Sequence, residues 1–211
     1  MLETLLRQLQ QAQTQQGGCA YCALEHYQVS RYLMGVANDG VNNIPLRQRL
    51  QQQGGYCLRH CQAFNVHSHV LSSAILLDAF VSSRLARVEA GKRPQVIACE
   101  ACSIEDSTRK LIRDTLGRYR NDSQVQQLLQ DFPPCLPHLE SFAPKLPAPL
   151  RQTLVAQHQP LRHNLAELIR KHDYRFQQES ISDAERGSIQ AALRVLGAAE
   201  SSAKDPEAEK G

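Results

Sequence analysis

One pattern of cysteines and histidines occurs twice in this chain of 211 residues. Each copy has a Cys-x-x-Cys pair followed, after 34 residues in the first copy and 32 in the second, by a Cys-x-x-His pair. The first copy contributes Cys19, Cys22, Cys57 and His60, and the second contributes Cys99, Cys102, Cys135 and His138. Three sulfurs and one imidazole nitrogen form the usual closed tetrahedral set of a structural zinc site. The sequence therefore predicts two Cys₃His metal sites.

The similarity between the two copies extends beyond the ligands. The stretch LRQRLQQQGGYCLRHCQAF aligns with DSQVQQLLQDFPPCLPHLESF, and Glu25 and Glu105 each follow their cysteine pair by three residues. Self-similarity of this kind predicts a duplicated helical unit. Cys61 aligns with Leu139. Because free cysteine packs as a small hydrophobic residue, we expect Cys61 to face the core and to stay outside the ligand set.

Apolar residues recur at helical spacing along most of the chain, and the alternation typical of strands is not sustained anywhere. We expect helices over 2–15, 22–37, 45–53, 58–90, 102–119, 123–131, 149–172 and 182–197. Pro160 is expected to kink or divide the helix at 149–172. The clearest stripe is Val66, Val70, Ala74, Leu77, Val81, Leu85 and Val88, which predicts one continuous helix with this face toward the core. Ser182 and Glu185 form a capping-box pattern at the start of the last helix.

The predicted fold is all-α, with two pseudo-repeated helical halves, each with a Cys₃His metal site, and a C-terminal helical closure. The expected segments are an N-terminal helix over 1–18, a first metal-binding repeat over 19–90, a linker over 91–98, a second repeat over 99–178, a C-terminal helix over 179–198 and a disordered tail over 199–211. The simplest grouping places each ligand set within its own half. A crossed grouping, in which Cys19 and Cys22 join Cys135 and His138, stays open at this point.

The spacing of the ligands suits metal binding at the starts of helices. Two residues between cysteines let both sulfurs reach one ion, and a helix N-terminus favours the thiolate that a metal needs. Zn²⁺ is the expected ion at both sites, and an iron–sulfur cluster is the alternative, since Cys₃His ligation can hold one. Six thiolates and two zinc ions would change the formal charge of +3 by −6 + 4 = −2, to about +1.

Other features narrow the function classes. Glu25 and Glu105 would either orient a ligand histidine from behind or form an ordinary ion pair. The small net charge and scattered basic residues make nucleic-acid binding unlikely. The polar start MLETLLRQLQ lacks the apolar core of a secretory signal, and no apolar run is long enough for a membrane span, so we expect a soluble, cytoplasmic protein.

The motifs together resemble an uncharacterised prokaryotic family, a domain of unknown function. Its members carry duplicated C-x-x-C…(G)(F/Y)C-x-x-H motifs and a K-x-D-Y-R-F segment near the C-terminus, and the similarity runs from about Cys19 to Gly197. This sequence has Tyr56 where the family tends to have Phe. The resemblance implies that the eight cysteines and histidines, and Lys171, Asp173, Tyr174 and Arg175, occupy the family's motif positions. Because the family has no assigned function, the resemblance implies no reaction.

These observations predict a zinc-stabilised helical binding or adaptor protein with two structural sites and an unidentified protein partner. An enzyme is disfavoured, because four protein ligands leave no open coordination position. The alternative is an iron–sulfur or thiol-based redox sensor that uses the same residues, with Cys61 as a reactive thiol. The metal's identity, the ligand grouping, the partner and the oligomeric state are left undecided by the residues alone.

Overall fold

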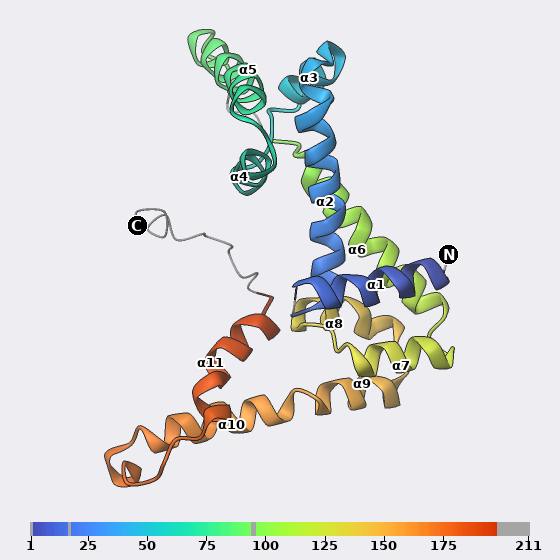
Figure 1. Ribbon diagram of the computed structural model, residues 1–211, viewed down its shortest axis with the longest axis vertical. Coiled ribbons are helices and arrows are strands. Elements are labelled where there is room, and N and C mark those ends of the chain that lie inside the picture. The colour runs from blue at the N-terminus through green and yellow to red at the C-terminus, as the bar shows by residue number, and fades with distance from the viewer. Residues whose placement is uncertain (1, 17, 94–95, 198–211) are drawn as a thin grey trace. The chain divides into compact units, whose positions relative to one another are not determined.

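The computed structural model describes residues 2–16, 18–93 and 96–197, and its secondary structure over these ranges is entirely helical (Figure 1). This confirms the all-α prediction. The helices are α1 (Leu2–Gln16), α2 (Ala20–Asn38), η1 (Gly40–Asn42), α3 (Ile44–Gln52), α4 (Leu58–His67), α5 (Val70–Glu89), α6 (Glu100–Arg118), α7 (Ser123–Asp131), α8 (Leu136–Phe142), η2 (Ala143–Lys145), α9 (Ala148–Ala156), α10 (Gln159–Lys171), η3 (Tyr174–Phe176) and α11 (Asp183–Val195). The expected tail over 199–211 lies outside the described residues.

The chain divides into two compact units. The first combines Met1–Ala23 with Ile112–Gly211, and the second is Leu24–Leu111. The division falls inside α2 and α6, so each sequence copy contributes residues to both units. None of the helices in the described ranges has the length and apolar character that crossing a bilayer requires.

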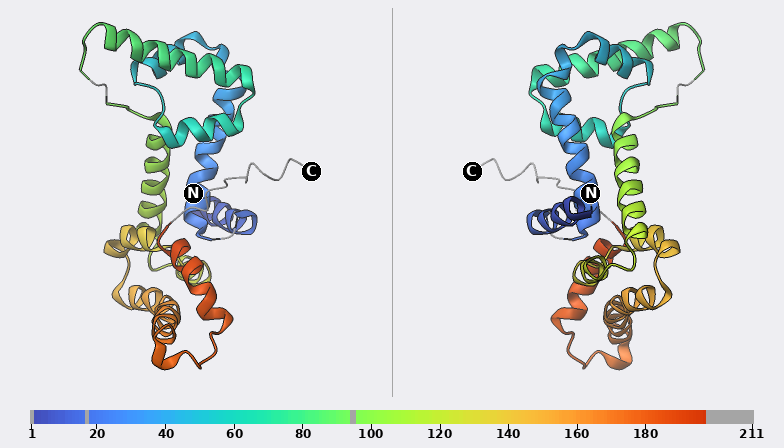
Figure 2. Two further views of the ribbon diagram at one scale, coloured as in Figure 1. Left: turned by 90° about the vertical axis from the view of Figure 1, so that its left-hand side faces the viewer. Right: turned by 90° about the vertical axis from the view of Figure 1, so that its right-hand side faces the viewer.

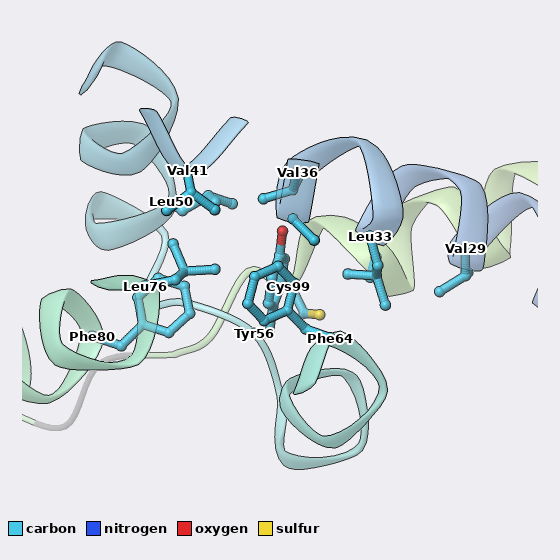
Figure 3. Packing of buried hydrophobic residues seen from close by; sticks show 12 residues of the cluster. Val29, Leu33, Val36, Val41, Leu50, Tyr56, Phe64, Leu76, Phe80 and Cys99 are labelled. Carbon is cyan, nitrogen blue, oxygen red and sulfur yellow. The ribbon is translucent and has the colours of Figure 1, made fainter. Parts of the chain in front are cut away.

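The second unit packs α3, α4 and α5 with the residues of α2 and α6 that belong to it. Its core gathers large side chains from these helices, including Leu33, Leu50, Tyr56, Phe64 and Leu76 (Figure 3). Tyr56 is buried and donates its hydroxyl to that of Tyr32 at 3.0 Å. Gly55 has a φ of +82°, and a Cβ there would lie 2.8 Å from the Phe80 ring. Glycine therefore allows the tight turn that leads from α3 into Cys57.

The helix predicted over 58–90 is two helices, so that prediction is wrong. Ser68 has an extended backbone between α4 and α5. Its hydroxyl contacts that of Ser73, which also donates to the Asn65 side chain at 2.9 Å. Serine side chains that bond locally compete with helical backbone bonds, and this cluster closes the corner between the two helices.

Most of the apolar stripe on α5 lies on the outside of the second unit, which also differs from the expectation, and only Leu77 of the stripe packs partly against the described core of that unit. Val70 is 87 % exposed and Val88 is 74 % exposed, whereas Ser73, Leu76 and Phe80 are buried. The core of the unit is therefore built on a face of α5 with fewer aliphatic residues but with a phenylalanine. The aliphatic stripe has no covering element among the described residues of its unit.

In the first unit, α10 and α11 form a helical hairpin (Figure 2). The segment predicted over 149–172 divides at His158 into α9 and α10, close to the predicted break at Pro160. The capping box is confirmed: Ser182 accepts from the Glu185 amide, and the Glu185 carboxylate accepts from the Ser182 amide. Lys171 pairs with Glu185 at 2.8 Å and ties α10 to α11.

Candidate metal centres

The structure gathers all eight predicted ligands into two groups of four. The first centre consists of Cys19, Cys22, Cys135 and His138, in the first unit. The second centre consists of Cys57, His60, Cys99 and Cys102, in the second unit. Each group joins the Cys-x-x-Cys of one copy to the Cys-x-x-His of the other. The expectation that each half holds its own set is therefore wrong, and the crossed grouping is the one observed.

Helix length explains why the sets cross. After Cys22 the chain continues along α2, whose 19 residues extend about 28 Å. The next helix, α3, has only 9 residues and extends about 14 Å, half the length of α2, so this helix by itself does not return the chain to the start of α2. Cys57 instead meets Cys99 and Cys102 at the start of α6. The similarly long α6 then separates Cys102 from Cys135.

Every ligand lies at the beginning of a helix. Cys57 and Cys135 are the N-cap residues of α4 and α8, and neither helix has a hydrogen bond from the cap side chain. Cys19 and Cys99 directly precede α2 and α6, and their carbonyls accept the first helical bonds at 3.0 and 3.1 Å. The four remaining ligands, Cys22, His60, Cys102 and His138, each follow three residues later. Each centre thus lies between two helix N-termini, whose dipoles stabilise thiolates.

The distances within each group fit one tetrahedral ion. Zinc with bonds of about 2.3 Å to sulfur and about 2.05 Å to nitrogen places two sulfurs about 3.8 Å apart, and sulfur and nitrogen about 3.6 Å apart. In the second centre, His60 Nδ1 is 3.3 Å from each sulfur, and the Cys57 and Cys102 sulfurs are 3.7 Å apart.

The first centre has matching dimensions. His138 Nδ1 is 3.1, 3.5 and 3.7 Å from the sulfurs of Cys135, Cys22 and Cys19, and the Cys22 and Cys135 sulfurs are 3.7 Å apart. All seven cysteines are free thiols. Each group therefore has the dimensions of a cage for a single ion.

Without an ion, the crowded sulfurs cannot all carry charge. Hydrogen bonds from Cys135 and Cys22 lower the pKa of Cys19, and the same bonding raises the pKa of Cys22. In the second centre, burial and the hydrogen bond with Cys99 raise the pKa of Cys102 to about 12. Burial lowers the pKa of His60, which keeps its ring neutral and able to bind a metal. A divalent cation would relieve this repulsion.

Aromatic side chains surround the histidine of the first centre. Tyr21, between the two cysteines of α2, is fully buried, and its ring centroid lies 5.7 Å from that of His138. Phe142 packs edge-on against Tyr21 at 5.1 Å and lies 5.6 Å from His138. The Tyr21 hydroxyl is buried, and no described residue offers it a hydrogen-bond partner. These contacts hold the first turns of α2 and α8 together by packing.

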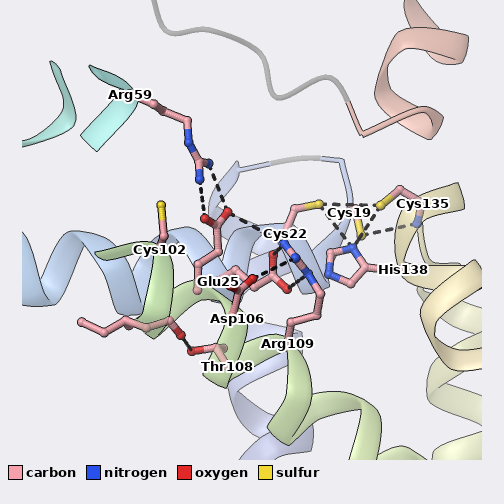
Figure 4. A network of polar contacts seen from close by, with 12 residues as sticks. Cys19, Cys22, Glu25, Arg59, Cys102, Asp106, Thr108, Arg109, Cys135 and His138 are labelled. Carbon is pink, nitrogen blue, oxygen red and sulfur yellow. Dashed lines mark hydrogen bonds and ion pairs between the residues drawn. The ribbon is translucent and has the colours of Figure 1, made fainter. Parts of the chain in front are cut away.

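Ion pairs surround the second centre. The carboxylate of Glu105 accepts two hydrogen bonds from Arg59, and Arg109 binds Glu25 through two bonds of 2.9 and 3.0 Å (Figure 4). Glu105 Oε2 lies 3.9 Å from His60 Nε2. Burial raises the pKa of Glu105, but Arg59 outweighs this and holds the pKa below its usual range. Of the two glutamates predicted as orienting groups, Glu105 thus lies beside a ligand histidine of its own unit.

The sequence analysis did not identify Arg59 and Arg109 as partners of these glutamates. Arg59 lies between two ligands of its motif, and Arg109 lies one helical turn after Glu105, but neither position by itself indicates which carboxylate the guanidinium meets. Only the crossed arrangement of α4 and α6 brings Arg59 to Glu105.

Cys61 belongs to neither group of ligand atoms. Its sulfur lies 3.5 Å from the Tyr56 carbonyl, and burial raises the pKa of its thiol. In the K-x-D-Y-R-F segment, Asp173 caps η3 and pairs with Arg175 at 2.7 Å, while Tyr174 is 80 % exposed. Lys171 is the residue of this segment that pairs with the last helix, through Glu185.

The two centres are closed sets of four soft donors in a helical protein, compatible with metal ions. Comparison with known proteins found no matching family model, no matching curated protein and no matching solved structure.

Proposed function

We propose that this chain is a non-enzymatic, zinc-stabilised helical protein that acts by binding another protein. The observation that carries the proposal is the pair of Cys₃His groups, in each of which all four donor atoms lie within 4.8 Å of one another. Four protein ligands of this kind are typical of structural zinc, whereas catalytic zinc usually keeps one position for water. An ion in either centre would add folding free energy by joining two helix starts.

The surface supports the binding part of the proposal. Leu71, Val81 and Leu85 on α5 are 71, 55 and 57 % exposed, beside the more exposed Val70 and Val88. Contiguous aliphatic surface of this extent is uncommon on a soluble monomer and is typical of protein interfaces. The formal charge of +3 gives no comparable support for nucleic acid as the partner.

The spacing of the sulfurs favours a single ion over an iron–sulfur cluster. The four ligands of a cluster are divided among two or more iron atoms, so the four donors are spread more widely than donors that share one ion, whereas in each group here they lie within 4.8 Å of one another. The 3.7 Å separations in both centres match the shared-ion case. Zinc is the divalent ion that this donor set most commonly binds in a closed tetrahedral site.

The experiment is anaerobic purification followed by metal analysis and a visible spectrum. We expect a colourless protein with two zinc ions per chain, which loses helical signal when a strong chelator is added. The variant Cys61→Ser is the matched control, because it removes a thiol outside both centres, and it should retain both ions. A brown protein with stoichiometric iron would overturn the zinc assignment, and a fully folded protein with neither metal would overturn the metal function.

A further inference from the structure

The second centre presents one nitrogen of His60 to the metal and leaves the other facing away from the sulfurs. Nδ1 is 3.3 Å from each of the three sulfurs, so Nδ1 is the ligand atom. A neutral imidazole that binds a metal through one nitrogen carries its proton on the other. Nε2 of His60 must therefore bear a hydrogen in the metal-bound protein. Because His60 is only 3 % exposed, this N–H requires an acceptor from the protein or a buried water.

Glu105 is the carboxylate that faces this hydrogen. Its Oε2 lies 3.9 Å from His60 Nε2, and its side chain is 11 % exposed. The distance exceeds a hydrogen bond by about 1 Å, which a small joint shift of the His60 ring and the Glu105 side chain would close. Glu105 lies one helical turn after the ligand Cys102 on α6. The position of its backbone is thus fixed by the same helix start that binds the metal.

One arginine holds the carboxylate, and a second lies near it. Arg59, the residue before His60, donates to both oxygens of Glu105. Arg109 donates its two close hydrogen bonds to Glu25, and its Nη2 lies 3.9 Å from Glu105 Oε1. A bidentate guanidinium contact fixes the plane of a carboxylate as well as its charge. The carboxylate therefore has a defined orientation toward the imidazole.

We propose that Glu105 is a positioning residue of the second centre, which accepts the Nε2 hydrogen of His60 and so fixes the ring with Nδ1 toward the metal. The inference rests on the proposed zinc-binding function and adds a residue outside the ligand set. A carboxylate behind a ligand histidine makes the imidazole a stronger ligand and restricts its rotation. The ion pair between Arg59 and Glu105 joins α4 to α6 beside the metal. The starts of these two helices are therefore connected both by the metal and by the ion pair.

The arginine that holds Glu105 is not repeated in the other copy. The residue that aligns with Arg59 there is Pro137, which offers no donor for a carboxylate. Glu25, the residue that aligns with Glu105, is also bound by an arginine, but this arginine is Arg109 of α6. The contact between Arg59 and Glu105 therefore belongs to the second centre alone among these two ion pairs.

The test uses the full-length zinc-loaded protein and three variants. Glu105→Ala removes the acceptor, Glu105→Gln keeps an oxygen that can accept the hydrogen, and Glu100→Gln is the matched control. Glu100 lies on the same helix next to the ligand Cys99, and its carboxylate pairs with an arginine, Arg49, at 3.1 Å. Zinc affinity is measured by competition with a chromophoric chelator, which should resolve one ion per centre.

We expect Glu105→Ala to weaken one of the two zinc ions by about 10- to 100-fold and to leave the other unchanged. Glu105→Gln should recover most of this loss, and Glu100→Gln should behave as the wild type. An ordinary loss of the Arg59 ion pair would not be rescued by glutamine, so the rescue distinguishes positioning from stability alone. Equal affinities in Glu105→Ala and Glu100→Gln would overturn the inference.

A second measurement does not depend on the variants folding. In a ¹H–¹⁵N spectrum of the histidine rings of wild-type protein, His60 should show an Nε2 hydrogen that exchanges slowly with water. A rapidly exchanging Nε2 hydrogen, or a proton on Nδ1, would contradict the role of Glu105 even if both zinc ions are bound. A protein that binds no zinc at all would contradict the proposed function instead, so the two failures are distinguishable.

Discussion

The two metal centres have the same ligands at the same helix positions, but their surroundings differ. Around the first centre, Tyr21 and Phe142 pack against the ring of His138. Around the second, Arg59 holds Glu105, whose carboxylate lies 3.9 Å from the ring of His60. The position equivalent to Tyr21 is Ala101, which is also fully buried but offers no aromatic surface. The candidate ligands thus have the same residue types and positions in both centres, whereas aromatic packing lies beside the first centre and an ion pair lies beside the second.

The largest expected effect comes from removing a ligand, and it tests which residues share an ion. Cys57→Ser removes one of the four donors of the second centre, which should then lose its metal. The effect on stability should be large, because the binding free energy of a structural zinc is of the order of 10 kcal/mol. Cys99 and Cys102 should then react with iodoacetamide, while Cys19 and Cys22 stay protected. Mass spectrometry of the alkylated protein measures this. Alkylation of Cys19 and Cys22 instead would show that they share an ion with Cys57, which would support a grouping within each half of the chain.

Removing the aromatic packing of the first centre should have the next largest effect. Tyr21→Ala should lower the free energy of unfolding by about 3–5 kcal/mol, because a fully buried aromatic ring is lost. Tyr21→Phe is the control and should be neutral or slightly stabilising, since the hydroxyl has no hydrogen-bond partner among the described residues. Denaturant titration of the zinc-loaded proteins compares them. If Tyr21→Phe were as damaging as Tyr21→Ala, the contribution of packing to this centre would be refuted.

The core beside the second centre offers a test of the two faces of α5. Leu76→Ala should cost about 2–5 kcal/mol, because this residue is fully buried in the cluster that includes Cys99. Val81→Ala, one turn along on the exposed stripe, should change stability by no more than about 0.5 kcal/mol in a monomer. The measurement is thermal or chemical unfolding at low protein concentration. A reversed order of the two losses would return the aliphatic stripe to the core.

The smallest expected effect concerns the additional cysteine beside the second centre. Cys61→Ser should cost about 1 kcal/mol or less, since the thiol only fills space and contacts the Tyr56 carbonyl. Both zinc ions should be retained, as metal analysis would show. A loss of zinc equal to that in Cys57→Ser would place Cys61 among the ligands and would make the two centres chemically different.

The sequence was sufficient for the ligand residues and for most helix positions, because both depend on local patterns. Cys-x-x-Cys and Cys-x-x-His identify donors within one helical turn, and Ser182 with Glu185 identifies a helix start. The sequence was insufficient for the grouping of the ligands. The alignment of the two copies shows which residues are equivalent, but it does not show which Cys-x-x-Cys pair lies beside which Cys-x-x-His pair. That depends on the length of α2 relative to α3.

Periodicity was also insufficient for the burial of α5. It detects an aliphatic stripe such as Val70, Val81 and Val88, but it does not show which face the rest of the unit covers. The covered face includes Phe80, whose ring packs in the core, and Ser73, whose hydroxyl bonds at the corner between two helices. A serine on a buried face weakens the apolar signal of that face, so the pattern favoured the wrong one.

The crossed grouping has a consequence for how the chain must assemble. Neither copy taken alone owns a complete cage: residues 19–90 supply two cysteines to one ion and a cysteine and a histidine to the other, and residues 99–178 supply the complements. A chain with one copy alone would need a second chain to complete either group. A chain with both copies assembles each group within one molecule, at an effective concentration set by the residues that link the copies.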